Sequence, residues 1–164
     1  MTVFDLTGQK YNKQSTPIQL GANQWERKIV IKGSEITALS TTASDVFKVL
    51  NLGQNVMVNE MATIVTDADD TSITLKIGYT DGTNTDEDAY DADVALDSTG
   101  ITALGNNDFT ANVLLIDEAV GADFFLTLTF SALSTLDDAT EFIILVKGSS
   151  FNDVPYATTL NAPV

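Results

Sequence analysis

The chain has 164 residues, of which 44% are hydrophobic, and it carries a formal net charge of −15 with no cysteine and no histidine. This length fits a single domain, and no apolar run approaches the ~18 residues that a membrane-spanning helix needs. The missing cysteines exclude disulfides and thiolate metal sites, the missing histidines remove the usual general base, and the acidic charge opposes binding to nucleic acid or anionic lipid.

The first predicted element is an extended N-terminal arm over residues 1–26. Residues 7–24 are rich in Gly, Gln, Asn, Ser and Thr and show no strand or helix periodicity. Residues 1–32 hold five basic and two acidic side chains, whereas the remaining 132 residues hold three basic and twenty-one acidic. This opposite charge favours an arm that becomes ordered on a partner, and a frayed terminus is the alternative.

The body, residues 27–150, is predicted to be an antiparallel β-sandwich. Residues 73–80 alternate apolar and polar side chains before an Asp-Gly turn, and residues 124–130 repeat the pattern. Eight strands follow one another at sandwich-like intervals, and almost no helix is expected. Their predicted ranges are 27–32, 46–52, 56–66, 72–80, 93–97, 111–116, 124–130 and 141–147. An extended C-terminal tail over residues 151–164 completes the chain.

The last strand is apolar on both faces, from Phe142 to Val146. Such a strand suits a central position between its own sheet and another surface. That surface is either a second subunit or the opposite sheet of the same sandwich. The first alternative predicts an oligomer, with a trimer as the expected form and Phe142, Ile144 and Val146 at its interface.

The densest acidic stretch, residues 81–93, is predicted to be a solvated loop. Its oxygen ligands could in principle hold calcium, but an EF-hand requires glycine at the sixth position and glutamate at the twelfth. Those positions hold Asp86 and Ala92, so no calcium site is expected. Phosphate-binding loops, nucleophile elbows and zinc patterns are also missing, so we expect no catalytic residues, no metal and no cofactor.

Several of these segments together resemble a group of small virion proteins of tailed phages, the head-decoration or cement proteins. The resemblance runs over residues 46–147, in strand and turn texture. It is carried by residues 46–52 (Val-Phe-Lys-Val-Leu-Asn-Leu), 55–58 (Asn-Val-Met-Val), 66–68 (Thr-Asp-Ala), 75–82 (Leu-Lys-Ile-Gly-Tyr-Thr-Asp-Gly), 91–96 (Asp-Ala-Asp-Val-Ala-Leu), 126–133 (Leu-Thr-Leu-Thr-Phe-Ser-Ala-Leu) and 143–146 (Ile-Ile-Leu-Val). It implies a jelly-roll sandwich on a capsid, commonly a trimer, with arms that reach neighbouring shell subunits.

The resulting expectation is a non-catalytic protein of the virion surface, made in the host cytoplasm because no secretory signal precedes the arm. It would cement the shell by binding the major capsid protein. The alternatives are a fibre or host-binding adhesin domain and, more remotely, a carbohydrate-active enzyme. The expected capsid-binding residues are Lys10, Tyr11, Lys13, Ile18, Leu20, Trp25, Arg27 and Lys28.

Overall fold

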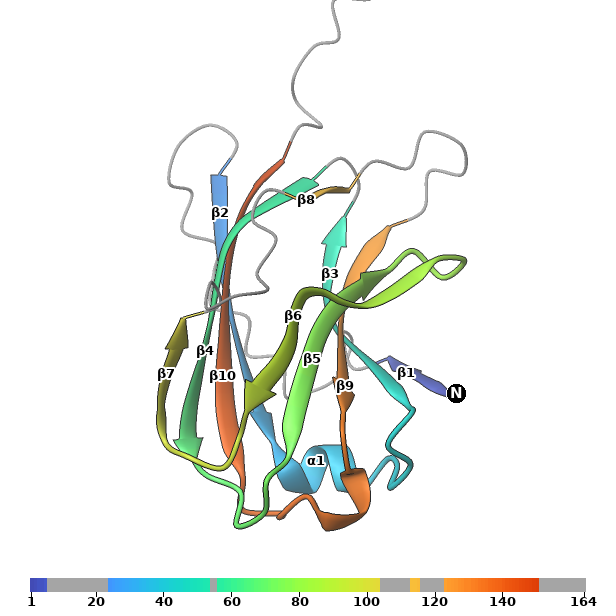
Figure 1. Ribbon diagram of the computed structural model, residues 1–164. Helices are drawn as coiled ribbons and strands as arrows, with labels where there is room; N and C mark the ends of the chain where they lie inside the picture. Colours follow the sequence, from blue (N-terminus) through green and yellow to red (C-terminus); the bar gives the residue numbers. More distant parts are fainter. Residues whose placement is uncertain (6–23, 54–55, 104–112, 116–122, 151–164) are drawn as a thin grey trace, which may run out of the picture.

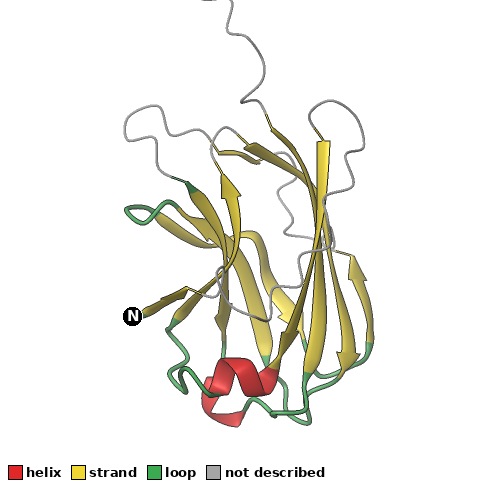
Figure 2. Cartoon of the chain, turned by 180° about the vertical axis from the view of Figure 1, so that it is seen from behind, coloured by secondary structure: helices red, strands yellow, loops and turns green. Residues whose placement is uncertain are grey.

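The computed structural model describes residues 1–5, 24–53, 56–103, 113–115 and 123–150. In these residues two β-sheets pack face to face (Figures 1 and 2). One short helix, α1 (Gly33–Thr37), and a 3-10 turn, Leu133–Thr135, lie together at one end of the sandwich. The described part of the chain contains no helix long and apolar enough to cross a membrane.

The strands divide between the two sheets in a non-sequential order. The first sheet runs β1-β3-β9-β5-β6, and the second runs β2-β10-β4-β7 with β8 also paired to β4. The first sheet consists of β1 (Val3–Asp5), β3 (Val46–Gly53), β9 (Phe124–Phe130), β5 (Thr74–Thr80) and β6 (Thr85–Ala95). The second consists of β2 (Gln24–Lys32), β10 (Glu141–Ser150), β4 (Val56–Asp67), β7 (Gly100–Ala103) and β8 (Val113–Leu115).

The pairing of these strands is that of a jelly roll. Apart from β1 and β8, the strands pair from the outside of the sequence inward: β2 with β10, β3 with β9, β4 with β7, and β5 with β6. All four pairings are antiparallel, as expected when a long hairpin folds over on itself into two sheets. The predicted jelly-roll-like, all-β sandwich is therefore confirmed.

The sandwich is held together by aromatic contacts across its core. Phe130 of β9 meets Phe47 of β3 and Phe142 of β10 edge to face, with ring centroids 5.8 and 6.2 Å apart. The Phe130–Phe142 contact connects the inner faces of the two sheets, and the Phe47–Phe130 contact joins neighbouring strands of the first sheet. Each such pair adds stability beyond the area it buries.

The side chains expected at a subunit interface are part of this core. Phe142, Ile144 and Val146 are 0% exposed in the single chain. A side chain with no exposed surface has none left to bury against a second copy. Of the two alternatives left open by the apolar strand, burial in its own sandwich is therefore the one that holds for these three residues.

The acidic stretch is a strand where a loop was expected, so the loop prediction is wrong. Strand β6 begins at Thr85, and only residues 81–84 connect it to β5. Its acidic side chains Asp86, Asp88 and Asp93 are exposed, while Tyr90 and Val94 are buried in the core. Because β6 is an edge strand, exposed carboxylates protect it from pairing with other chains.

The N-terminal residues add an edge strand that the sequence did not predict. Strand β1 runs parallel to β3, and Phe4 stacks on Phe47 at 5.3 Å. Asp45 holds this end of the chain: its Oδ1 accepts a hydrogen bond from the backbone N–H of Thr2 (2.7 Å), and its Oδ2 accepts one from Ser40 (2.6 Å). Residues 6–23, most of the predicted arm, and the tail, residues 151–164, lie outside the described residues.

Thr63 is one of several buried side chains in the described residues with a polar atom that has no hydrogen-bond partner. Thr63 of β4 is 0% exposed, and its hydroxyl has no hydrogen-bond partner among the described residues. A buried hydroxyl without a partner costs free energy, and valine has nearly the same shape. We expect Thr63→Val to raise the free energy of unfolding by about 1 kcal/mol in urea denaturation.

The control for this prediction is Thr63→Ala, which removes the hydroxyl together with a methyl group. It should lower stability by about 1 kcal/mol, because the lost packing exceeds the relief of the buried hydroxyl. A Thr63→Val protein that unfolds more easily than the wild type would mean that the hydroxyl is hydrogen-bonded in solution.

Candidate functional site

The predicted docking residues fall into two groups. Lys10, Tyr11, Lys13, Ile18 and Leu20 lie outside the described residues, so their role stays a prediction. Trp25, Arg27 and Lys28 lie on β2, at an edge of the second sheet. The structure thus extends the second sheet to Gln24 and brings the C-terminal end of the predicted arm into the body.

Trp25 and Arg27 form a partly buried pair next to β10. The Arg27 guanidinium lies 5.8 Å from the Trp25 ring centroid, and its Nη1 donates a hydrogen bond to the Glu26 carbonyl (3.1 Å). Burial lowers the pKa of Arg27. A Cβ on Gly148 would collide with the Trp25 indole, so this glycine provides the space in which the indole packs against the core.

Lys28 has a different environment, because it points away from the core. Its neighbours Ile29 and Ile31 are buried, while Lys28 itself is exposed on the outer face of the second sheet. In register it lies beside Leu145 of β10. The three described members of the predicted site therefore do not form one surface patch: Trp25 and Arg27 support the sheet edge, and Lys28 is available to a partner.

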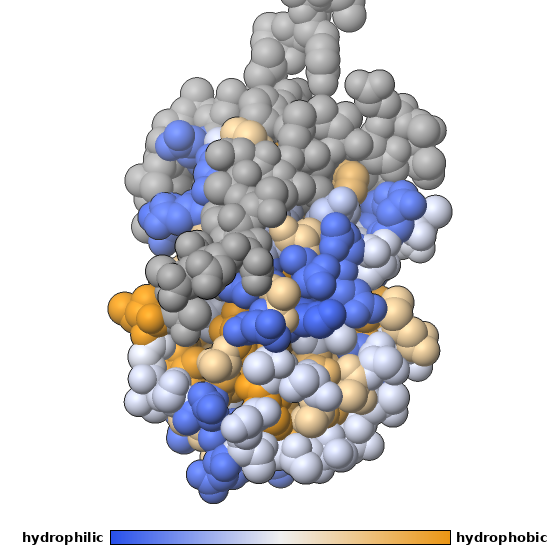
Figure 3. Space-filling model, in the orientation of Figure 1, coloured by the Kyte–Doolittle hydropathy of each residue, from blue (hydrophilic) through white to orange (hydrophobic). Residues whose placement is uncertain are grey.

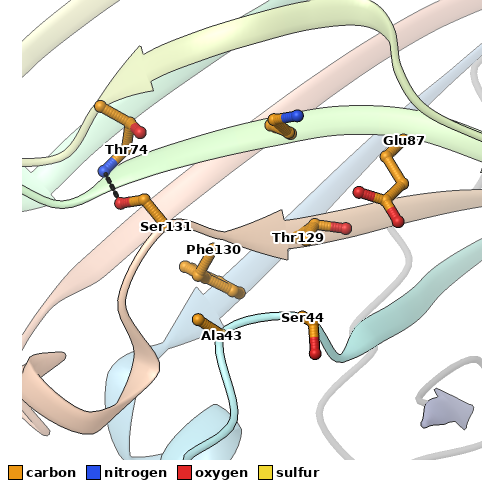
Figure 4. Close-up of a pocket in the computed structure, with 8 residues that line it drawn as sticks. Ala43, Ser44, Thr74, Glu87, Thr129, Phe130 and Ser131 are labelled. Atoms are coloured by element: carbon orange, nitrogen blue, oxygen red, sulfur yellow. Dashed lines mark hydrogen bonds between the residues drawn. The ribbon is translucent and has the colours of Figure 1, made fainter. Parts of the chain in front are cut away.

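A shallow pocket of about 300 Å³ opens over strands β5, β6 and β9 and the segment that leads into β3 (Figure 4). No sequence pattern predicts this pocket, because its residues come together only when the first sheet forms. Ser131 accepts a hydrogen bond from the backbone N–H of Thr74 (2.9 Å), while the buried Thr129 hydroxyl has no partner among the described residues. The lining consists of Ala43, Ser44, Thr74, Lys76, Glu87, Thr129, Phe130 and Ser131.

The pocket combines hydroxyl groups, one lysine and one carboxylate with apolar surface. Glu87 is its one carboxylate, and within the described part of the chain no hydrogen bond joins Glu87 to a lining hydroxyl. The lining therefore does not present the hydrogen-bonded nucleophile and base that covalent catalysis requires. Across residues 1–5, 24–53, 56–103, 113–115 and 123–150, no group of three or more carboxylates is placed to hold a metal ion.

Asp81 is the first residue of the acidic stretch that was compared with a calcium-binding loop, and its carboxylate accepts hydrogen bonds within the β5–β6 turn. Its Oδ1 accepts hydrogen bonds from the backbone N–H groups of Thr83 (2.7 Å) and Asn84 (2.6 Å), and its Oδ2 accepts one from the Asn84 side chain (2.9 Å). These hydrogen bonds, led by that of the Asn84 backbone, lower the pKa of Asp81. The absence of calcium binding stays a prediction.

Comparison with known proteins finds resemblance in fold and none in sequence. No protein-family model matches the chain, and no curated protein matches it. A chain in the capsid structure of Ralstonia phage GP4 is similar with a TM-score of 0.60 and 14% identity, over 92% of this chain and 99% of that one. A chain in the capsid asymmetric unit of cyanophage Pam1 is similar with a TM-score of 0.50 and 15% identity, over 84% of this chain and 91% of that one.

A third similarity is weaker. A chain in the acid-stable capsid structure of the Helicobacter pylori bacteriophage KHP30 has a TM-score of 0.46 and 11% identity, over 82% of this chain and 93% of that one. At identities of 14 and 15%, the first two similarities establish the architecture alone. This chain shares its jelly-roll sandwich with chains found in phage capsid structures.

Proposed function

We propose that this chain is a structural component of a phage capsid that decorates the shell and stabilises it by binding the major capsid protein. One observation carries the proposal: the fold matches a chain of the Ralstonia phage GP4 capsid along 92% of this chain and 99% of that one. The likeness therefore extends over the whole body and is not confined to one sheet or hairpin. Its location would be the virion surface, and its role would need no cofactor and no catalysis.

The charge distribution supports different roles for the arm and the body. The arm, in which residues 6–23 hold Lys10 and Lys13 and no acidic side chain, would contact the shell, while the acidic body would face solvent and repel nucleic acid. Lys10 and Lys13 would steer docking, and the apolar surface of Tyr11, Ile18 and Leu20 would supply most of the affinity. Trp25 and Arg27 would act indirectly, by packing at the edge of the second sheet where the arm begins. A shell repeats one contact many times, so avidity compensates for a weak single interface.

Binding to capsid particles tests the proposed function directly. Particles of the phage that carries this gene, prepared without the protein, should retain the purified chain when they are pelleted, and cryo-microscopy should show added density on the shell. A protein that stays in the supernatant at micromolar concentration would contradict the proposal. Turnover or retention on a glycan panel in that case would favour the enzyme or the adhesin alternative.

Reversing the arm charges should weaken this binding. The double variant Lys10→Glu, Lys13→Glu is expected to reduce the affinity for particles about tenfold, since exposed charge contacts contribute up to about 1 kcal/mol each. The loss should shrink as salt is raised and screens the charges. These substitutions leave β1 in place, whereas deleting the arm from residue 1 would also remove an edge strand of the first sheet.

The matched control reverses two lysines of the body. Lys48 and Lys76 lie on strands β3 and β5 of the first sheet, and Lys76 forms an exposed ion pair with Asp88 at 3.5 Å. The variant Lys48→Glu, Lys76→Glu has the same net charge as the arm variant and should bind nearly as the wild type does. Equal losses in the two variants would mean that overall charge, and not the arm, governs docking.

A further inference from the structure

The outer face of the second sheet carries an apolar row that crosses four strands. Val30 of β2, Ile143 of β10, Ile64 of β4 and Ile101 of β7 lie side by side in register. Their sequence neighbours Ile29, Phe142, Ile144 and Val65 are buried in the core, so the row faces outward. We call these four residues the apolar row.

In β10 the apolar row lies on the solvent-facing side, and the other side of this strand is buried in the core. Ile101 is 74% exposed, and the other three members are half-buried. Hydrophobic residues reach the surface in this region, at the left margin of Figure 3 where Figure 1 places β7. Leu145 and Ala62, paired in register next to the row, widen the apolar strip.

Charged side chains border the strip, and most of them are already paired. Lys147 and Glu60 form an ion pair at 2.9 Å on one side, and Lys32 and Glu141 form one at 3.5 Å on the other. An apolar centre with a polar rim is the usual anatomy of a protein interface. Because these charges neutralise one another within the chain, a partner could cover them without leaving an unpaired charge behind.

The charge balance indicates which partner fits. The outer face of β2, β10 and β4 holds three basic and four acidic side chains: Lys28, Lys32, Lys147, Glu26, Glu60, Asp67 and Glu141. The other described residues hold three basic and fifteen acidic side chains. Two copies of so acidic a chain repel each other over most of their surface, and this face is the nearly neutral exception among the described residues.

We propose that the outer face of the second sheet, centred on the apolar row, binds a second copy of this chain. The exposed Ile101 and its three neighbours provide the area to be buried, and the nearly balanced rim avoids most of the charge repulsion that the rest of the body would impose. The predicted self-association is thereby transferred from Phe142, Ile144 and Val146 to the opposite face of the same strand. This inference does not depend on the proposed capsid function.

The test is the mass of the protein in solution. By sedimentation equilibrium at micromolar concentration, the wild type should have a mass of two or more times the 17.5 kDa of one chain. Ile101→Lys places a charge at the most exposed point of the row and should weaken self-association at least about tenfold. Circular dichroism and the melting temperature of this variant should match those of wild-type monomer, because residue 101 contributes little to the core.

Leu39→Lys is the matched control. Leu39 is also an exposed large hydrophobic residue, at 36%, but it follows α1 and belongs to none of the strands of the second sheet. It should leave the mass unchanged. A wild type that stays monomeric, or an Ile101→Lys protein that associates like the wild type, overturns the proposal. A monomer whose binding to capsid particles is lost in Ile101→Lys would assign this face to the shell and equally overturn it.

Discussion

Replacing Gly78 with alanine is expected to lower the free energy of unfolding by about 3 kcal/mol, one of the two largest effects that the structure predicts. In the β5–β6 pair, Ile77 is opposite Asp91 and Tyr79 is opposite Asp86, so the β6 backbone carries extra residues across this point. A Cβ on Gly78 would collide with the carbonyl oxygen of Asp86 and lie 2.7 Å from that of Glu87. Backbone atoms in a paired strand cannot yield as a flexible side chain can. Urea denaturation of the variant and the wild type measures the difference.

Gly82→Ala separates this steric effect from the general cost of losing a glycine. Gly82 has a φ of +92°, and a Cβ there would meet nothing within 4 Å. Alanine at this position should cost about 1 kcal/mol, from the left-handed backbone alone. If Gly78→Ala is no more destabilising than Gly82→Ala, β6 does not cross over Gly78 as described.

The same irregularity explains why the sequence predicts a loop where the structure has β6. Strand β9 could be predicted to its exact ends, because apolar residues and threonine alternate along residues 126–130, although the structure buries both faces of the strand. In β6 the extra residues break the alternation, so that Tyr90 and Asp91 are buried in succession. Its acidic composition is that of an edge strand exposed to water, which in sequence looks like a solvated loop.

Short elements were missed for a different reason. Strands β1 and β7 have three and four residues, and helix α1 has five. Segments of this length are too short for a periodic pattern, so they form because the long strands provide partners. Strand β1, for example, depends on the contact of Phe4 with Phe47 and on the carboxylate of Asp45.

The candidate sites show the same limit of sequence reasoning. An apolar run such as that of β10 indicates that both faces of the strand are buried, within the domain or against a partner, but it does not say which face packs on the opposite sheet. That choice is fixed by the register with β2 and β4, which aligns Ile143 with Val30 and Ile64. Contacts that join distant turns, such as those of Asp69, likewise have no local signature.

Replacing Asp69 with asparagine is the second change expected to have a large effect. The side chain is 3% exposed, and its Oδ1 accepts hydrogen bonds from the backbone N–H (2.7 Å) and hydroxyl (2.6 Å) of Thr71. Its Oδ2 accepts hydrogen bonds from the backbone N–H of Asp137 (2.8 Å) and the hydroxyl of Thr140 (3.0 Å). The carboxylate therefore joins the turn after β4 to the turn before β10. Asparagine cannot accept at both positions, so Asp69→Asn should lower the free energy of unfolding by about 3 kcal/mol at neutral pH.

The pH dependence of this loss identifies the carboxylate as its cause. Burial raises the pKa of Asp69, but the hydrogen bonds from Thr71, Asp137 and Thr140 together outweigh burial, and the net shift is downward. A lowered pKa stabilises the fold above the unfolded value of about 3.9, and this contribution disappears as the pH falls through the lower, folded value. The stability difference between wild type and Asp69→Asn should therefore be constant near neutral pH and narrow below about pH 4.

Asp70→Asn, at the exposed neighbouring position, is the matched control and should stay within about 0.5 kcal/mol of the wild type. If the difference in free energy of unfolding between wild type and Asp69→Asn stays unchanged in strong acid, the ionised carboxylate is not what joins the two turns.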